Sequence, residues 1–150
     1  MSSWRLFESG GEREVVADEY VVDTDIVSYL FREDSRVEPY RSYLTGSSLA
    51  VSFMTKAELD RWALARQWGD ARRRLLDGHI DQFATIRVDR DLCRIWARAM
   101  EQGRTSGRPI QVGDAWVAAT AIRLGVPLIT NNHNDYADVS DLVVVRPDIV

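Results

Sequence analysis

From residue 20 onward, short apolar runs alternate with longer segments of helical periodicity, and this alternation limits the possible folds more than any other feature. The apolar runs are residues 21–22, 49–51, 85–88, 127–129 and 142–145. Helical patterns lie between them, at residues 25–31, 37–44, 55–68, 70–83, 89–102 and 114–124. Strands that alternate with helices form a mostly parallel sheet covered by helices on both faces. The sequence therefore predicts an α/β fold with three layers, α/β/α, and a mostly parallel five-stranded sheet.

The size and composition suit a single folded domain. The chain has 150 residues, of which 45% are hydrophobic. We expect residues 1–18, with Gly10-Gly11 and scattered charge, to form an appended arm that is partly disordered, and residues 19–150 to form the domain. No run reaches the roughly 18 apolar residues of a membrane span, and the N-terminus lacks the order of a signal peptide. These features predict a soluble, cytoplasmic protein with no membrane partner.

Four acidic residues fall near one edge of the predicted sheet. Asp23 ends the first strand, Glu58 lies one turn into the helix after the second, Asp114 opens an apolar helix, and Asp135 follows the fourth strand. Functional groups in such sheets gather beyond the carboxyl ends of the strands. The four carboxylates can therefore converge although they are far apart in sequence.

Converging carboxylates repel one another and raise one another's pKa, so a positive group is expected among them. Cys93 is the only cysteine, and there are two histidines, so a site built on several cysteines is excluded. The remaining ligands are hard oxygens, which select Mg²⁺ or Mn²⁺. Such an ion can activate a water and stabilise charge on a phosphoryl group. The pattern therefore predicts metal-dependent hydrolysis of phosphodiester bonds.

Two of the acids also have purely structural explanations. Aspartate is a good helix N-cap, which would account for Asp114. Thr55 and Glu58 have the spacing of a capping box, which would account for Glu58.

The stretch Asp23-Thr24-Asp25 offers a rival chemistry. It fits the first motif of haloacid-dehalogenase-type phosphatases, in which Asp23 would be the nucleophile and Asp25 the general acid. That class also needs a lysine near the phosphate and a later pair of acids. Lys56 is the only lysine, and five uncharged residues follow Asp114. We therefore interpret Asp23 as a metal ligand and Asp25 as the N-cap of the first helix.

The blocks VVDTDIVSYL, SFMTKAEL, GRPIQVGDAWVAATAIRLGVPLITNN and VVVRP, spread over residues 20–147, resemble the PIN-domain ribonucleases. They are most similar to the VapC-type toxins of toxin–antitoxin pairs. The resemblance implies that one or two Mg²⁺ or Mn²⁺ ions are bound by four catalytic acids, Asp23, Glu58, Asp114 and Asp135. It implies supporting positions for Thr24, Thr130 and Asn132.

The resemblance also implies an activity and partners. The implied activity is that of an endoribonuclease that cleaves RNA such as tRNA or rRNA and is the toxin of a type II toxin–antitoxin system. The implied protein partners are a small antitoxin of VapB type and a second copy of the chain in a homodimer. The family's last loop usually has arginine where this chain has Asn131, and Asp-Phe where it has Asp135-Tyr136. The first departure leaves open a catalytically weak or inactive module that binds RNA or protein.

Overall fold

The computed structural model describes residues 18–147, in which four parallel strands form one sheet. The strands are β1 (Glu19–Val22), β2 (Ser48–Ser52), β3 (Ala84–Ile86) and β4 (Leu128–Ile129), in the order β3-β2-β1-β4. The α/β fold with a parallel sheet is confirmed. The first strand in sequence is an inner strand, with β2 on one side and β4 on the other.

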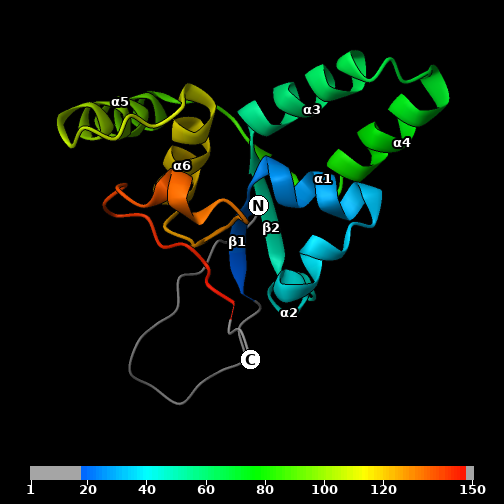
Figure 1. Ribbon diagram of the computed structural model, residues 1–150, viewed down its shortest axis with the longest axis horizontal. Coiled ribbons are helices and arrows are strands. Elements are labelled where there is room, and N and C mark those ends of the chain that lie inside the picture. The colour runs from blue at the N-terminus through cyan, green and yellow to red at the C-terminus, as the bar shows by residue number, and fades with distance from the viewer. Residues whose placement is uncertain (1–17, 148–150) are drawn as a thin grey trace.

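Helices connect the strands and cover both faces of the sheet (Figure 1). They are α1 (Thr24–Arg32), η1 (Ser35–Tyr40), α2 (Arg41–Leu44), α3 (Phe53–Ala65), α4 (Asp70–Ile80), α5 (Arg90–Thr105), α6 (Val112–Leu124) and η2 (His133–Tyr136). In Figure 1, α5 and α6 lie on one side of the strands, and α1, α3 and α4 on the other. None of the helices formed by residues 18–147 has the length and apolar character needed to cross a membrane.

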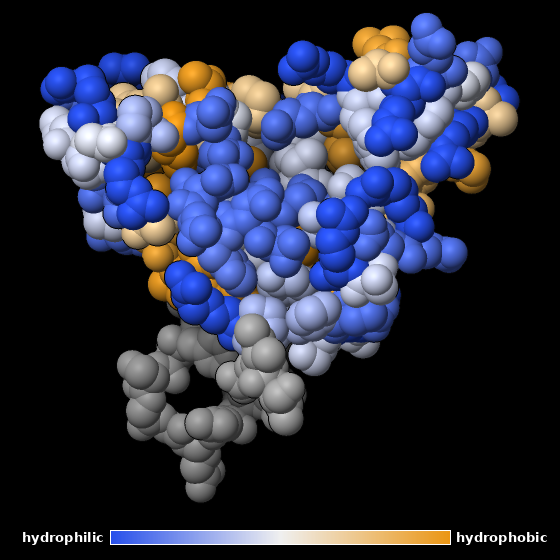
Figure 2. All heavy atoms as spheres, in the orientation of Figure 1, coloured by the Kyte–Doolittle hydropathy of each residue, from blue (hydrophilic) through white to orange (hydrophobic). Residues whose placement is uncertain are grey.

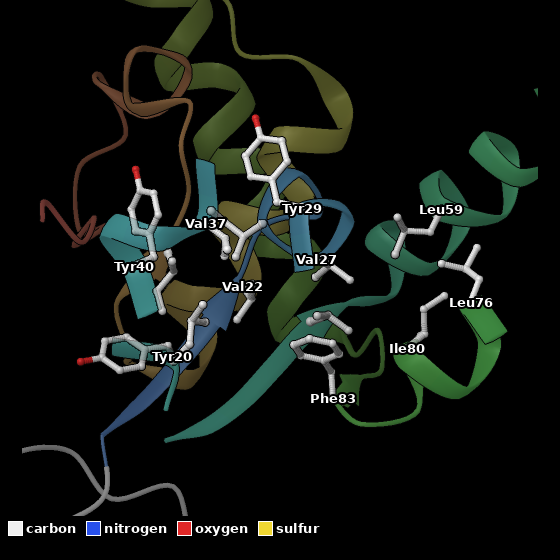
Figure 3. Packing of buried hydrophobic residues seen from close by; sticks show 14 of the residues in the cluster. Tyr20, Val22, Val27, Tyr29, Val37, Tyr40, Leu59, Leu76, Ile80 and Phe83 are labelled. Atoms are coloured by element: carbon white, nitrogen blue, oxygen red, sulfur yellow. The ribbon is translucent and has the colours of Figure 1, made fainter. Parts of the chain in front are cut away.

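The two core clusters follow from the alternation of side chains along β1. Val21 is in register with Ala50 of β2 and Leu128 of β4, and all three are buried in the cluster shared with α5 and α6. Val22 points to the opposite face and packs in the cluster that holds Leu59 of α3 (Figure 3). Because β1 is buried on both faces, its position in the sheet is fixed, and so is the residue that follows it.

The predicted fifth strand is wrong for the described part of the chain. Residues 142–145 make only an isolated parallel bridge, between Leu128 and Val144. The Leu128 amide donates to the Val143 carbonyl at 2.8 Å, and the Val145 amide donates to the Leu128 carbonyl at 2.8 Å. Since β4 offers two residues for pairing and Pro147 has no amide hydrogen, the ladder cannot extend.

Two helix ends lie where a capping residue or a glycine in the sequence predicts them. Asp89 caps α5 by accepting from the Leu92 amide at 2.7 Å, and Gly125 ends α6 with a left-handed φ of 69°. The helix predicted over residues 89–102 is longer than expected, because α5 continues through Gly103 to Thr105. A Cβ at Gly103 would lie 3.0 Å from the Ile110 amide nitrogen, so this glycine allows close packing of the next loop. The predicted arm, residues 1–18, lies outside the described residues except for Asp18.

Candidate active site

The carboxyl ends of β2, β1 and β4 bring three chain segments to one edge of the sheet. Asp23 directly follows β1, Thr130 directly follows β4, and α3, which carries Glu58, directly follows β2. Since these strands are neighbours and parallel, their ends meet at one rim. Hydrophilic side chains cover the middle of the molecule between the α5–α6 side and the α3–α4 side (Figure 2).

Asp23 is held rigidly at this edge. It is only 5% exposed, and its carboxylate accepts hydrogen bonds from the Thr24 amide at 2.7 Å, the Thr130 hydroxyl at 2.8 Å and the Tyr136 hydroxyl at 2.9 Å. Burial raises the pKa of Asp23, and the bonds from Thr130 and Tyr136 act in the opposite direction. Asp23 is thus a buried carboxylate of fixed orientation.

Asp23, not Asp25, is the N-cap of α1, which corrects our expectation for Asp25. The Asp25 carboxylate accepts from the Asn131 amide at 2.9 Å, so it attaches the loop after β4 to the first turn of α1. Burial, followed by repulsion from Asp23, raises the pKa of Asp25 to about 7. The sequence offered two aspartates within three positions, and the path of β1 decides which one caps.

Thr24 and Glu58 are linked by a direct hydrogen bond. The Thr24 hydroxyl lies 3.0 Å from Glu58 Oε1 and 2.9 Å from the Thr55 hydroxyl. The predicted capping box is wrong, because Ser52 caps α3 by accepting from the Met54 amide. Thr55 and Glu58 are therefore inside the helix, and their side chains face α1. Burial raises the pKa of the Glu58 carboxyl, as does its proximity to Asp23.

Asp114 approaches the same place from α6. The helix begins at Val112. Its N-cap residue is Gln111, whose side chain makes no capping hydrogen bond to the helix. A Cβ at Gly113 would lie 3.4 Å from Glu58 Oε2, so the glycine leaves room for that carboxylate. Burial raises the pKa of Asp114 to about 7, with further repulsion from Asp23, Asp135 and Glu58. Asp114 lies in the first turn of α6 and is not its N-cap.

Asp135 lies on η2 and is exposed. Its charge nevertheless raises the pKa of both Asp23 and Asp114, so it lies within electrostatic reach of them. The Asn132 amide donates to the Thr130 hydroxyl at 3.0 Å, which orders the turn that leads into η2. All four predicted acids therefore approach one another at a single edge.

The arrangement supplies oxygen donors of the type that Mg²⁺ and Mn²⁺ prefer. The charged neighbours that raise the pKa values of Glu58 and Asp114 are other carboxylates, which a cation would offset. Within residues 18–147, however, no three acidic, histidine or cysteine side chains already stand in an arrangement that holds a metal ion. The donor chemistry of the four carboxylates fits a metal of this type.

A cavity of about 210 Å³ adjoins the acids. Asp114 and Asp135 contribute to its wall, together with Arg108 and Asp138 from the loops around them. Arg108 Nε lies 3.2 Å from Asp138 Oδ2, and its side chain is 61% exposed. A largely exposed, positively charged side chain is therefore present beside the acidic edge.

Tyr136 is a functional candidate that was not among the residues predicted from the sequence. Its hydroxyl contacts Asp23 and lies 3.4 Å from Asp114 Oδ1. The sequence did contain a clue to its role. Tyr136 follows Asp135 at the position where the family pattern has phenylalanine, so it adds a hydroxyl next to the acids.

Comparison with known proteins gives a family match. The family model described as "PIN domain" matches residues 20–142. A curated relative, the VapC ribonuclease Y4jK of Sinorhizobium fredii, is 31% identical over 140 residues, covering 85% of this chain and 96% of the relative.

Solved structures are also similar. VapBC-1 from nontypeable Haemophilus influenzae aligns with a TM-score of 0.73 and 26% identity, covering 85% of this chain and 96% of that chain. VapBC-5 from Mycobacterium tuberculosis, a member of the VapBC family of toxin–antitoxin systems, aligns with a TM-score of 0.62 and 24% identity, covering 85% and 98%.

Proposed function

Because this chain belongs to the PIN-domain family and is similar to a VapC ribonuclease over nearly its whole length, we propose that it is a metal-dependent endoribonuclease and the toxin of a type II toxin–antitoxin pair. The proposed substrate is RNA, with tRNA or rRNA as the candidates. The PIN-domain match over residues 20–142 favours the nuclease over the haloacid-dehalogenase-type phosphatase.

The observation that carries the proposal is the convergence of carboxylates. Asp23, Asp135 and Glu58 each raise the cost of ionising Asp114. Asp135 does the same for Asp23, and Asp23 for Glu58. Bringing like charges together costs free energy unless a cation or protons offset them. A bound Mg²⁺ or Mn²⁺ would offset that repulsion, activate water and stabilise charge on the phosphoryl group.

The residues of the site would have different roles in metal binding, according to how rigidly each is held. Asp23 is buried and held by three hydrogen-bond donors, so it would be the most rigidly oriented ligand of the ion. The Thr24 hydroxyl would orient Glu58, because it donates to Oε1 when it is not donating to Thr55. Asp135 is exposed on a short 3-10 helix, so it would complete the ligand set by moving inward.

Arg108 is a candidate for holding the RNA strand beside the acids. The acidic edge by itself repels phosphate, so a nearby donor of positive charge is needed. Arg108 shares a cavity with Asp114 and Asp135, and guanidinium groups bind phosphate through paired hydrogen bonds. Its side chain is 61% exposed, so the guanidinium is open to a ligand from solvent. We assign Arg108 to a phosphate next to the scissile one.

The protein partners follow from the relatives. We propose that a small antitoxin of VapB type binds this chain, because the similar solved structures include members of VapBC toxin–antitoxin systems. We also propose that two copies of the chain form a dimer, as the family resemblance implies. Expression of the chain alone should arrest growth, and co-expression of its cognate antitoxin should relieve the arrest. Light scattering on the purified chain would measure whether it dimerises.

The central test is cleavage of labelled single-stranded RNA and of total tRNA by purified protein. We expect cleavage with Mn²⁺ or Mg²⁺, none with EDTA, and none by the Asp114→Asn variant. Asp60→Asn is the control for the same Asp-to-Asn change, because Asp60 is an exposed aspartate on α3 that is not one of the four acids. Undiminished cleavage by Asp114→Asn would refute the assignment of the site.

Two observations favour a second candidate, a binding module without catalysis. The described residues contain no ready-made set of three potential metal ligands, and Asn131 replaces the usual arginine of the family pattern. Titration calorimetry separates the two functions. Mn²⁺ binding that is lost in Asp23→Ala supports the nuclease, whereas RNA binding without any metal binding supports the module.

A further inference from the structure

The Tyr136 hydroxyl lies between two of the acids. Tyr136 Oη is 2.9 Å from Asp23 Oδ2 and 3.4 Å from Asp114 Oδ1. Asp23 follows β1 and Asp114 lies in the first turn of α6, so one side chain connects two elements that are distant in sequence.

The position of this hydroxyl is set by packing of the ring. Tyr136 is 2% exposed and belongs to the buried cluster that also contains Val21, Leu128 and Ala118. These neighbours come from β1, β4 and α6, the same elements that carry or adjoin the acids. The ring therefore places its oxygen as reproducibly as the core itself is packed.

The two carboxylates differ in the other hydrogen-bond donors that they contact. Asp23 also accepts from the Thr24 amide and the Thr130 hydroxyl. In the described part of the chain, the side-chain hydrogen bond of Asp114 is the one with Tyr136. A phenol has one proton, which the two carboxylates share in a three-centre hydrogen bond, with Asp23 the nearer acceptor. The pair is thereby kept close but incompletely satisfied, which leaves oxygen lone pairs for a cation.

We propose that Tyr136 is a positioning residue of the metal site, whose hydroxyl holds the Asp23 and Asp114 carboxylates together so that both can reach one divalent cation. This inference rests on the proposed function. It also gives a role to the tyrosine that departs from the Asp-Phe of the family pattern. Phenylalanine would fill the same apolar slot but leave the two carboxylates unconnected.

The test is Mn²⁺ affinity of the metal-free protein, measured by titration calorimetry. Hydrogen bonds to metal-ligating carboxylates set metal affinity, so Tyr136→Phe should bind Mn²⁺ about tenfold more weakly than the wild type. Tyr43→Phe is the matched control, because Tyr43 packs edge-on against Tyr20 near the opposite end of β1 and should leave affinity unchanged. Cooperative thermal melts of both variants would show that they are folded.

A Tyr136→Phe affinity within twofold of the wild type overturns the inference. If the variant does not fold, 3-fluorotyrosine placed at position 136 of the otherwise unchanged protein provides the second measurement. Its ¹⁹F resonance should shift as Mg²⁺ saturates the site, and a resonance that stays fixed overturns the inference. Asp23→Ala separates the two failures. If it too binds Mn²⁺ like the wild type, the proposed metal site is itself wrong.

Discussion

Replacing Asp114 by asparagine should stabilise the metal-free protein at pH 8 while destroying its response to metal. The folded protein holds the Asp114 carboxylate partly buried beside three other acids, which raises its pKa from 3.8 to about 7. Asparagine keeps nearly the same shape and retains an oxygen that can accept from Tyr136. It removes the charge that the fold has to accommodate.

The sign and size of the effect follow from linkage between ionisation and folding. Because the folded pKa lies above the unfolded value, ionisation of Asp114 costs folding free energy, fully above about pH 7 and not at all below about pH 3.8. The shift of about three pKa units corresponds to at most ~4 kcal/mol. Asp114 is partly solvated and its neighbours are screened, so we expect about 2 kcal/mol. For a chain of this length that equals a rise in Tm of roughly 4–8 °C.

Thermal melts of wild type and Asp114→Asn, at pH 5 and pH 8, would measure this. In EDTA at pH 8 the variant should melt higher, and at pH 5 the gap should be smaller, because a larger fraction of Asp114 is then protonated in the folded state. With Mg²⁺ at 100 times its Kd, the wild type should gain about 2.7 kcal/mol and the variant nothing, so the order should reverse. A variant that melts lower than the wild type in EDTA at pH 8, or a gap independent of pH, would refute the reasoning.

Three further substitutions test other parts of the structure. Thr24→Val keeps the side-chain shape but leaves Glu58 without its hydroxyl donor, so initial rates of RNA cleavage should fall roughly tenfold, and unchanged rates would contradict the role of Thr24. Arg108→Gln should weaken RNA binding and reduce the slope of log affinity against log salt by about 0.7, whereas Arg123→Gln, at the far end of α6, should not. Gly125→Ala should lower the urea-derived free energy of unfolding by roughly 1 kcal/mol, because φ is 69° there; a neutral result would exclude strain at this turn.

Local signals in the sequence predicted the elements of the fold well. The apolar runs located all four strands, and the side chains that cap or end a helix without competition, Asp89 and Gly125, did so. Two of the failures, both at helix N-caps, occurred where two candidate residues stood close together. Asp23 and Asp25 compete for α1, and Ser52 and Thr55 for α3. Such a choice depends on where the preceding strand ends, which the paired strands determine and the local sequence does not.

The candidate site could be predicted as a set of residues but not as an arrangement. Asp23, Glu58, Asp114 and Asp135 were all placed at the strand-end edge of a parallel sheet, and the structure brings them within electrostatic reach of one another. The links between them were not predictable. Thr24 reaches a residue 34 positions away, and Tyr136 a residue 113 positions away.

The sequence by itself determined the α/β class and the edge of the sheet at which the acids would lie, because both follow from the order of apolar runs and helical patterns along the chain. Only the tertiary structure decided that β1 lies between β2 and β4, that Gly113 makes room for Glu58, and that Tyr136 connects Asp23 with Asp114. These features depend on contacts between segments distant in sequence. Such contacts are set by packing of the whole core, in which each buried side chain constrains the others.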